Sequence, residues 1–132
     1  MLGQERYAPF LKFHSRGTSG VMLCYAVDDR KSFEHIAYWM KEIKSHRADD
    51  EICIYLVGMK SDVPGRVVDV KEGRKYADFY GIKFFEVNMK EDLNINGMFL
   101  TLAEDILDII ERKKEGVQAR ISTKNCGYCN VF

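Results

Sequence analysis

The sequence has no excess of either charge, no long apolar run and no amino-terminal leader pattern. Its 20 Lys and Arg balance 20 Asp and Glu, so the positive field typical of a nucleic-acid-binding domain is not expected. The longest uncharged apolar run, residues 20–27, is far shorter than the roughly 20 residues that a membrane-spanning helix needs. No basic region precedes an apolar core at the amino terminus. These absences predict a cytoplasmic protein that does not bind nucleic acid.

Cysteine and histidine are scarce. Four cysteines in 132 residues are too few for a disulfide framework. Cys24 and Cys53 lie inside apolar runs and are expected to be reduced core residues. The histidines, His14, His35 and His46, have no metal-ligand spacing, so no metal site is expected. With 46% hydrophobic and 30% charged residues, the chain has the composition of one globular domain.

Three short apolar runs alternate with longer amphipathic segments. Residues 20–27, 52–58 and 82–87 have the length of strands, and the first two have no polar face, which is typical of buried parallel strands. The segment Asp69-Val-Lys-Glu72 resembles a capping box that opens a helix ending near Tyr80. Apolar stripes predict two further helices. Their positions are Phe33, Ile36, Ala37, Met40 and Ile43 in the first, and Ile95, Met98, Phe99, Leu102, Ile106, Ile109 and Ile110 in the second.

The resulting order, β-α-β-α-β-α, predicts a three-layer α/β/α fold with a parallel sheet and right-handed crossovers. Ligands of such sheets bind beyond the carboxyl ends of the strands. Edge strands usually carry a charge, a proline or a bulge, and residues 20–27 carry no charge or proline. This run is therefore predicted to be central, with its second neighbour located before residue 1.

The loops after the second and third predicted strands hold residues that could bind a ligand. Lys60 and Asp62 follow the second run, where an aspartate carboxylate can accept two hydrogen bonds from guanine N1–H and N2–H₂ while the lysine stem lies along the base. A solvated turn is the alternative for this pair. The third loop reads Glu86-Val-Asn-Met-Lys90, and the amino terminus holds a Gly3-Gln4 pair that could contact a γ-phosphate and orient water.

In their order and spacing, these motifs resemble the Rab family of Ras-like small GTPases. The resemblance extends from Gly3 to about Ile110. The matching segments are Gly3-Gln-Glu-Arg-Tyr7, Tyr25-Ala-Val-Asp-Asp29, Trp39-Met-Lys-Glu-Ile43, Leu56-Val-Gly-Met-Lys-Ser-Asp62, Glu86-Val-Asn-Met-Lys90 and Phe99-Leu-Thr-Leu-Ala-Glu-Asp-Ile106.

The resemblance implies a switch in vesicle trafficking that binds GTP or GDP with Mg²⁺ and hydrolyses GTP. It implies that Gln4 positions the hydrolytic water and that Gly3 senses the γ-phosphate. The base pocket would comprise Met59, Lys60, Asp62, Asn88, Met89 and Lys90. Effectors, exchange factors and the prenylation machinery would be the partners.

Departures from the family pattern change this expectation. None of the ten glycines is followed by lysine, so the phosphate-binding loop G-x-x-x-x-G-K-[ST] is absent. The expected fold is thus a small-GTPase P-loop fold that lacks its first strand and helix. Met59 also replaces the family's Asn, while Asn88 and Met89 replace Ser and Ala. We expect residues 1–114 to form a partial GTPase domain that does not bind GTP alone. A nucleotide-free interaction module and a non-functional truncated copy are the alternatives.

Residues 115–132 show no periodicity and are predicted to form a flexible tail. The tail ends in Cys129-Asn-Val-Phe132, which fits C-a-a-X, and a final Phe favours geranylgeranylation of Cys129. Cys126 is a candidate second lipid site, or the two cysteines could form half of a zinc site. Lipidation predicts a peripheral protein on the cytosolic face of endomembranes or the plasma membrane.

Overall fold

The structure, a computed structural model, describes residues 17–46, 52–88, 90 and 94–125. Three strands alternate with three helices in the order that the sequence predicts. The strands are β1 (Gly20–Ala26), β2 (Cys53–Met59) and β3 (Lys83–Val87). The helices are α2 (Arg30–His46), α3 (Val70–Tyr80) and α4 (Ile95–Asn125).

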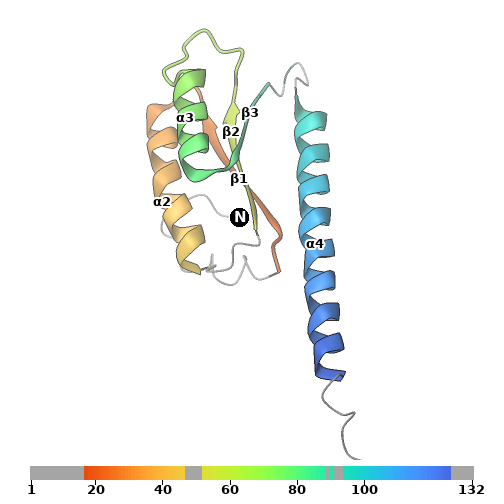
Figure 1. The fold of residues 1–132 in the computed structure, drawn as a ribbon. Helices are drawn as coiled ribbons and strands as arrows, with labels where there is room; N and C mark the ends of the chain where they lie inside the picture. The colour runs from red at the N-terminus through yellow and green to blue at the C-terminus, as the bar shows by residue number, and fades with distance from the viewer. Residues whose placement is uncertain (1–16, 47–51, 89, 91–93, 126–132) are drawn as a thin grey trace, which may run out of the picture.

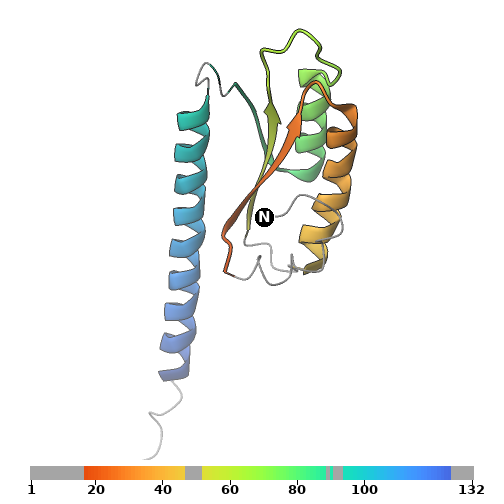
Figure 2. The same ribbon diagram turned by 180° about the vertical axis from the view of Figure 1, so that it is seen from behind.

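The strands form one parallel sheet in the order β1-β2-β3. In its register, Leu23 lies opposite Leu56, which in turn lies opposite Phe84. Helices α2 and α3 connect successive strands and cover one face, while α4 stands against the other (Figures 1 and 2). The predicted three-layer α/β/α arrangement is therefore confirmed, and it directs the carboxyl ends of all three strands to the same edge.

Two apolar clusters hold the layers together. The larger one lies between the sheet and helices α2 and α3, and the smaller one lies between the sheet and α4. Most predicted stripe positions face these clusters, although Ala37 and Phe99 are exposed. The buried residues of the larger cluster are Leu23, Tyr25, Val27, Ile36, Met40, Ile43, Leu56, Val68 and Ala77; those of the smaller are Tyr55, Val57, Val87 and Met98.

Helix α3 begins and ends with well-defined caps. The Asp69 carboxylate accepts a hydrogen bond from the Lys71 N–H at 3.1 Å, which confirms the predicted amino-terminal cap. Gly81 closes the helix at φ 64°, a left-handed conformation that glycine adopts without a Cβ clash. Both carboxylate oxygens of Glu72 accept hydrogen bonds from Arg30 at 2.7 and 2.6 Å, so the start of α2 is fastened to the start of α3.

Helix α4 is joined to the sheet by a polar contact as well as by apolar packing. The Tyr55 hydroxyl donates to Asp105, and the Lys83 ammonium donates to the same carboxylate at 2.9 Å. The hydrogen bond from Lys83, followed by that from Tyr55, lowers the pKa of Asp105. Gly20 allows close approach, because a Cβ there would lie 2.8 Å from Ile106 Cδ1.

The central position predicted for residues 20–27 requires a neighbour before residue 1, so it stays a prediction for the part of the chain that the structure describes. There β1 pairs with β2 alone and forms an edge of the sheet. The prediction that both cysteines are core residues is wrong. Cys24 is exposed because no described element covers its part of the sheet, and Cys53 is half-buried near the start of β2. Both thiols are free, as expected.

Helix α4 also continues beyond the point where a flexible tail was predicted to start. It runs to Asn125, whereas the tail was expected from Glu115. Gly116 after Arg112, Lys113 and Lys114 is typical of a helix end, but the helix continues through it, and residues 117–125 contain neither proline nor glycine. The division of the chain at residue 114 stays a prediction. Among the described helices, none is both long and apolar enough to cross a membrane.

Candidate functional site

A cavity of about 360 Å³ lies where the three strands end. Asp28 follows β1, Lys60 follows β2 directly, and Asn88 follows β3 directly. This placement agrees with the expectation that ligands of a parallel sheet bind beyond its carboxyl edge. The lining residues are Asp28, Lys60, Asp62, Val63, Asn88 and Lys90.

Four residues that the sequence predicted for a base pocket thus meet at one cavity: Lys60, Asp62, Asn88 and Lys90. Met59 is different, because its half-buried side chain packs against the apolar cluster beneath α4. Asp28 was not predicted as a site residue. Its position directly after the first predicted strand could have indicated it, because ligands of parallel sheets bind beyond the strand ends. The remaining candidates, Gly3, Gln4, Met89, Cys126 and Cys129, lie outside the described residues.

Backbone hydrogen bonds fix the strand ends relative to one another. The Val27 N–H donates to the Met59 carbonyl at 3.0 Å, and the Val27 carbonyl accepts from Val67 and Val68 at 2.8 and 3.1 Å. The Ser61 N–H donates to the Val87 carbonyl at 3.3 Å. The loop after β2 is therefore attached to the ends of both neighbouring strands.

Lys60 occupies a left-handed backbone conformation and makes an ion pair. Its φ is 61°, which is uncommon for a residue with a Cβ. Its ammonium donates to the two carboxylate oxygens of Asp28 at 3.1 and 3.0 Å. The Asp28 side chain is only 27% exposed, whereas that of Lys60 is 56% exposed. The lysine charge is thus directed to a carboxylate of the cavity wall.

Asn88 is a buried amide with unused hydrogen-bonding capacity. It is 1% exposed, and its Oδ1 accepts from the Lys90 N–H at 2.9 Å. Its Nδ2 has no hydrogen-bond partner among the residues that the structure describes. A buried donor without a partner is costly, so this group is suited to donate to an acceptor on a ligand in the cavity.

An ion pair behind the cavity holds the loop that carries Lys60 and Asp62. Arg66 donates to both oxygens of Glu86 on β3, at 2.7 and 2.8 Å, and also to the Ser61 carbonyl at 3.4 Å. Side-chain exposure is 28% for Arg66 and 16% for Glu86. The hydrogen bond to Glu86 raises the pKa of Arg66, and sequence reasoning had not singled out Arg66.

The arrangement suits a flat, polar heterocycle better than a metal ion. The exposed Asp62 carboxylate has two acceptor oxygens, and the Asn88 amide supplies a donor on the same cavity wall. Guanine presents the complementary set, with N1–H and N2–H₂ donors beside the O6 acceptor. Within the described residues, no group of three or more histidine, cysteine, aspartate or glutamate side chains is placed to hold a metal ion.

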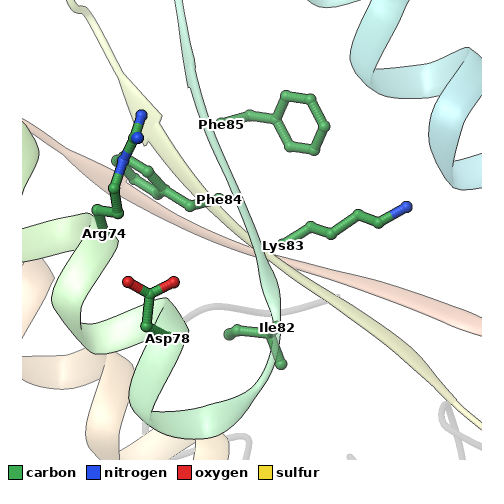
Figure 3. A pocket seen from close by; sticks show the side chains of 6 residues that line it. All are labelled: Arg74, Asp78, Ile82, Lys83, Phe84 and Phe85. Carbon is green, nitrogen blue, oxygen red and sulfur yellow. The ribbon is translucent and has the colours of Figure 1, made fainter.

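A second hollow, of about 290 Å³, lies against β3 and the adjoining face of α3 (Figure 3). Arg74 and Asp78 come from α3, while Phe84 and Phe85 lie on opposite sides of β3 (Figure 3). Lys83 of this hollow is already paired with Asp105. The hollow lies beside β3, which pairs only with β2 among the described strands, and it shares no lining residue with the cavity at the carboxyl ends of the strands.

Comparisons with known proteins agree with this geometry. The Ras family pattern matches residues 2–108. Ras-related protein RABE1d of Arabidopsis thaliana is 42% identical over 106 residues, covering 79% of this chain and 49% of that protein. Ras-related protein SEC4 of Saccharomyces cerevisiae is 40% identical over 112 residues, covering 85% and 52%. Ras-related protein Rab-10 of Diplobatis ommata is 40% identical over 129 residues, covering 95% and 63%.

The chain therefore belongs to the Ras family of small GTPases. Within that family it is a Rab protein, as its relatives RABE1d, SEC4 and Rab-10 indicate. It spans about half the length of the first two relatives named, 49% and 52%. The family predicted from the sequence motifs is confirmed.

Proposed function

We propose that this chain carries the guanine-recognition part of a Rab-type switch in vesicle trafficking. The observation that supports this most is the cavity at the carboxyl ends of the strands, which is lined by Asp62 and by Asn88, whose Nδ2 has no hydrogen-bond partner among the described residues. In this proposal Asp62 accepts the N1–H and N2–H₂ of guanine, and Asn88 Nδ2 donates to O6. The stem of Lys60 lies along the base, while Met89 and Lys90 complete the pocket.

The described residues fit the base but not the rest of a Mg²⁺–GTP complex. Ras-family membership implies guanine nucleotide and Mg²⁺ as ligands. However, the Lys60 ammonium is paired with Asp28, and the sequence contains no Gly-Lys pair that could start the G-K-[ST] end of a phosphate loop. The proposed roles of Gly3 and Gln4 at the γ-phosphate concern residues outside the described part.

Titration of the purified 132-residue chain with guanosine, adenosine and GTP tests this proposal. We expect guanosine to bind more tightly than adenosine, and GTP to gain nothing from its phosphates or from added Mg²⁺. Asp62→Ala is expected to weaken guanosine binding by roughly tenfold or more, because hydrogen bonds to charged groups contribute about 1.5–3 kcal/mol. Asp78→Ala, an exposed aspartate on α3, is the matched control.

Two results of that titration would contradict the proposal in different ways. Equal binding of guanosine and adenosine, or equal effects of the two aspartate variants, would overturn base recognition by Asp62. Saturable, Mg²⁺-dependent binding of GTP would overturn the expected failure to bind the triphosphate. A soluble chain that binds no base would leave a nucleotide-free interaction module, whereas a chain that does not unfold cooperatively would favour a non-functional copy.

We also propose that Cys129 carries a geranylgeranyl group, with Cys126 as a second candidate. The support is the C-a-a-X sequence at residues 129–132 together with membership of the Rab group. A lipid there would place the protein on a cytosolic membrane face, where effectors, exchange factors and the prenylation machinery would be its partners. The intact mass of the endogenous protein is expected to show an added isoprenoid and the loss of the last three residues. An unmodified carboxyl terminus would contradict this.

A further inference from the structure

Strand β3 has a free edge beside the hollow, because among the described strands it pairs only with β2. Proteins usually protect such an edge with charged side chains that discourage a further strand. The charged residues of β3 are Lys83 and Glu86, and each is held by an ion pair within the chain. Lys83 lies 2.7 Å from Asp105, and Glu86 lies 2.7 Å from Arg66. The side chains that could protect this edge are therefore already neutralised.

Every second residue along β3 directs its backbone groups to the free edge. The Val87 carbonyl accepts a hydrogen bond from the Ser61 N–H at 3.3 Å, so the backbone of Val87 faces β2. Because the hydrogen-bonding groups of successive strand residues point in alternate directions, those of Ile82, Phe84 and Glu86 face away from β2. Phe84 lies at the centre of this set.

Two of these backbone groups already have partners in the chain. The Glu86 carbonyl accepts from Asn94 Nδ2 at 3.2 Å, and the Ile82 N–H donates to the Ala77 carbonyl at 3.0 Å. Among the described residues, the groups left without a partner are both groups of Phe84, the Glu86 N–H and the Ile82 carbonyl. Each donor in this set is matched by an acceptor equally far along the strand on the other side of Phe84.

We propose that the free edge of β3 and the adjoining side of α3 form an interface between two copies of this chain. In this dimer the β3 strands pair antiparallel about a two-fold axis at Phe84. Each Phe84 N–H donates to the Phe84 carbonyl of the other copy, and each Glu86 N–H donates to the Ile82 carbonyl of the other copy. The groups that this register leaves over, the Ile82 N–H and the Glu86 carbonyl, are those that already have partners.

The charges of α3 favour a second copy over a peptide of one charge. Arg74 and Asp78 lie one helical turn apart and line the hollow from α3 (Figure 3). Both are exposed, and neither side chain has an ion pair or a hydrogen bond among the described residues. A two-fold axis perpendicular to the sheet places the two α3 helices antiparallel on the same face. Arg74 of each copy then meets Asp78 of the other, so the surface is complementary to itself.

The packing of α3 brings these charges close to the proposed axis. Gly73, next to Arg74, lies so near the Phe84 ring that a Cβ there would be 2.8 Å from it. On the other face of the sheet, the register sets Phe85 of each copy opposite the Lys83 stem of the other. One short strand and one side of a helix from each copy make a small interface, which predicts a weak dimer. The hollow shares no lining residue with the proposed guanine cavity, so the inference does not depend on that function.

Sedimentation velocity of the full 132-residue chain over a range of concentrations tests the dimer. We expect a monomer–dimer equilibrium with a Kd on the order of 100 µM. Hydrogen exchange of the Phe84 and Glu86 amides should slow as the dimer fills, while exchange of Met22 and Cys24 on the free edge of β1 should not. A chain that stays monomeric up to about 1 mM would overturn the inference. Protection on β1 instead of β3 would overturn it as well, because the dimer would then use the other described edge.

Charge reversal on α3 tests the proposed contact between the helices. Arg74→Glu or Asp78→Arg alone sets like charges against each other across the axis, so we expect each to raise the Kd of the dimer by roughly tenfold. The double variant restores opposite charges and should return the Kd to within about threefold of the unaltered chain. Lys75→Glu makes the same charge change as Arg74→Glu at an exposed neighbour that does not line the hollow, and it should have little effect.

The comparison of these variants separates the proposed contact from an effect of net charge. Equal weakening by Lys75→Glu and Arg74→Glu, or no recovery in the double variant, would overturn the pairing of Arg74 with Asp78. Thermal unfolding of each variant shows whether it is folded, and all of these positions are exposed. If one single variant does not fold, the other single variant and the exchange of the Phe84 and Glu86 amides in the unaltered chain decide the matter.

Discussion

Replacement of Glu86 by Gln is expected to destabilise the fold by about 3 kcal/mol, near the lower end of the range for breaking a buried ion pair. The pair formed by Arg66 and Glu86 is 28% and 16% exposed and has two hydrogen bonds of 2.7 and 2.8 Å. Glutamine leaves the Arg66 charge without a counterion in a partly desolvated place. Urea unfolding of the variant and the unaltered chain at neutral pH measures the difference.

The same substitution is also expected to weaken guanosine binding, because Arg66 holds the loop that carries Lys60 and Asp62. Glu72→Gln provides a matched control. Its pair with Arg30 has similar bond lengths, 2.7 and 2.6 Å, but the two side chains are 47% and 38% exposed. Surface pairs contribute little, so this control should unfold almost as the unaltered chain does. Equal losses in the two variants would contradict the importance of burial at Glu86.

Gly73→Ala is the second large expected effect, and its sign is opposite to what helix propensity predicts. Alanine in a helix interior is favoured over glycine by about 1 kcal/mol. At Gly73 in α3, however, a Cβ would lie 2.5 Å from the Tyr25 hydroxyl and 2.8 Å from the Phe84 ring. Because Tyr25 is 2% exposed and already packed against Phe33, it has little room to move, and we expect a net loss of about 1–3 kcal/mol.

Gly97→Ala is the control for this prediction. Gly97 lies in the first turn of α4, and a Cβ there would meet nothing within 4 Å. This variant should therefore be neutral or slightly more stable in thermal unfolding, while Gly73→Ala melts at a lower temperature. A stabilising effect of Gly73→Ala would show that the Tyr25 and Phe84 rings yield without cost, and it would contradict the close packing of α3 on the sheet.

Tyr25 lies close to both Glu86 and Gly73. Burial, and next the negative charge of Glu86, raise the pKa of Tyr25 to about 12. Its hydroxyl has no hydrogen-bond partner among the described residues. The ring therefore fills the space between the sheet and α3 as an apolar side chain, and the Arg66–Glu86 pair lies next to it. Loss of Glu86 and crowding at Gly73 thus disturb neighbouring parts of one region.

Local patterns in the sequence determined most of the architecture. The apolar runs predicted the limits of β2 and β3 to within about one residue, because strands buried on both faces are continuously apolar. Asp69 predicted the start of α3, because a helix cap depends on residues that are close in the chain. The order of the elements predicted a parallel sheet with helices on both faces. That order also placed Lys60, Asp62, Asn88 and Lys90 at one edge, since every strand of such a sheet ends on the same side.

Only the tertiary structure decided which groups meet. The sequence could not reveal that Asp28 takes the Lys60 ammonium or that Arg66 reaches Glu86, because these partners come from different loops and strands. It misjudged the burial of Cys24, because an apolar run does not show which of its two faces a neighbouring element covers. The distribution of charge on the cavity wall follows from such long-range pairings, because the Lys60 ammonium is directed to a carboxylate from another loop.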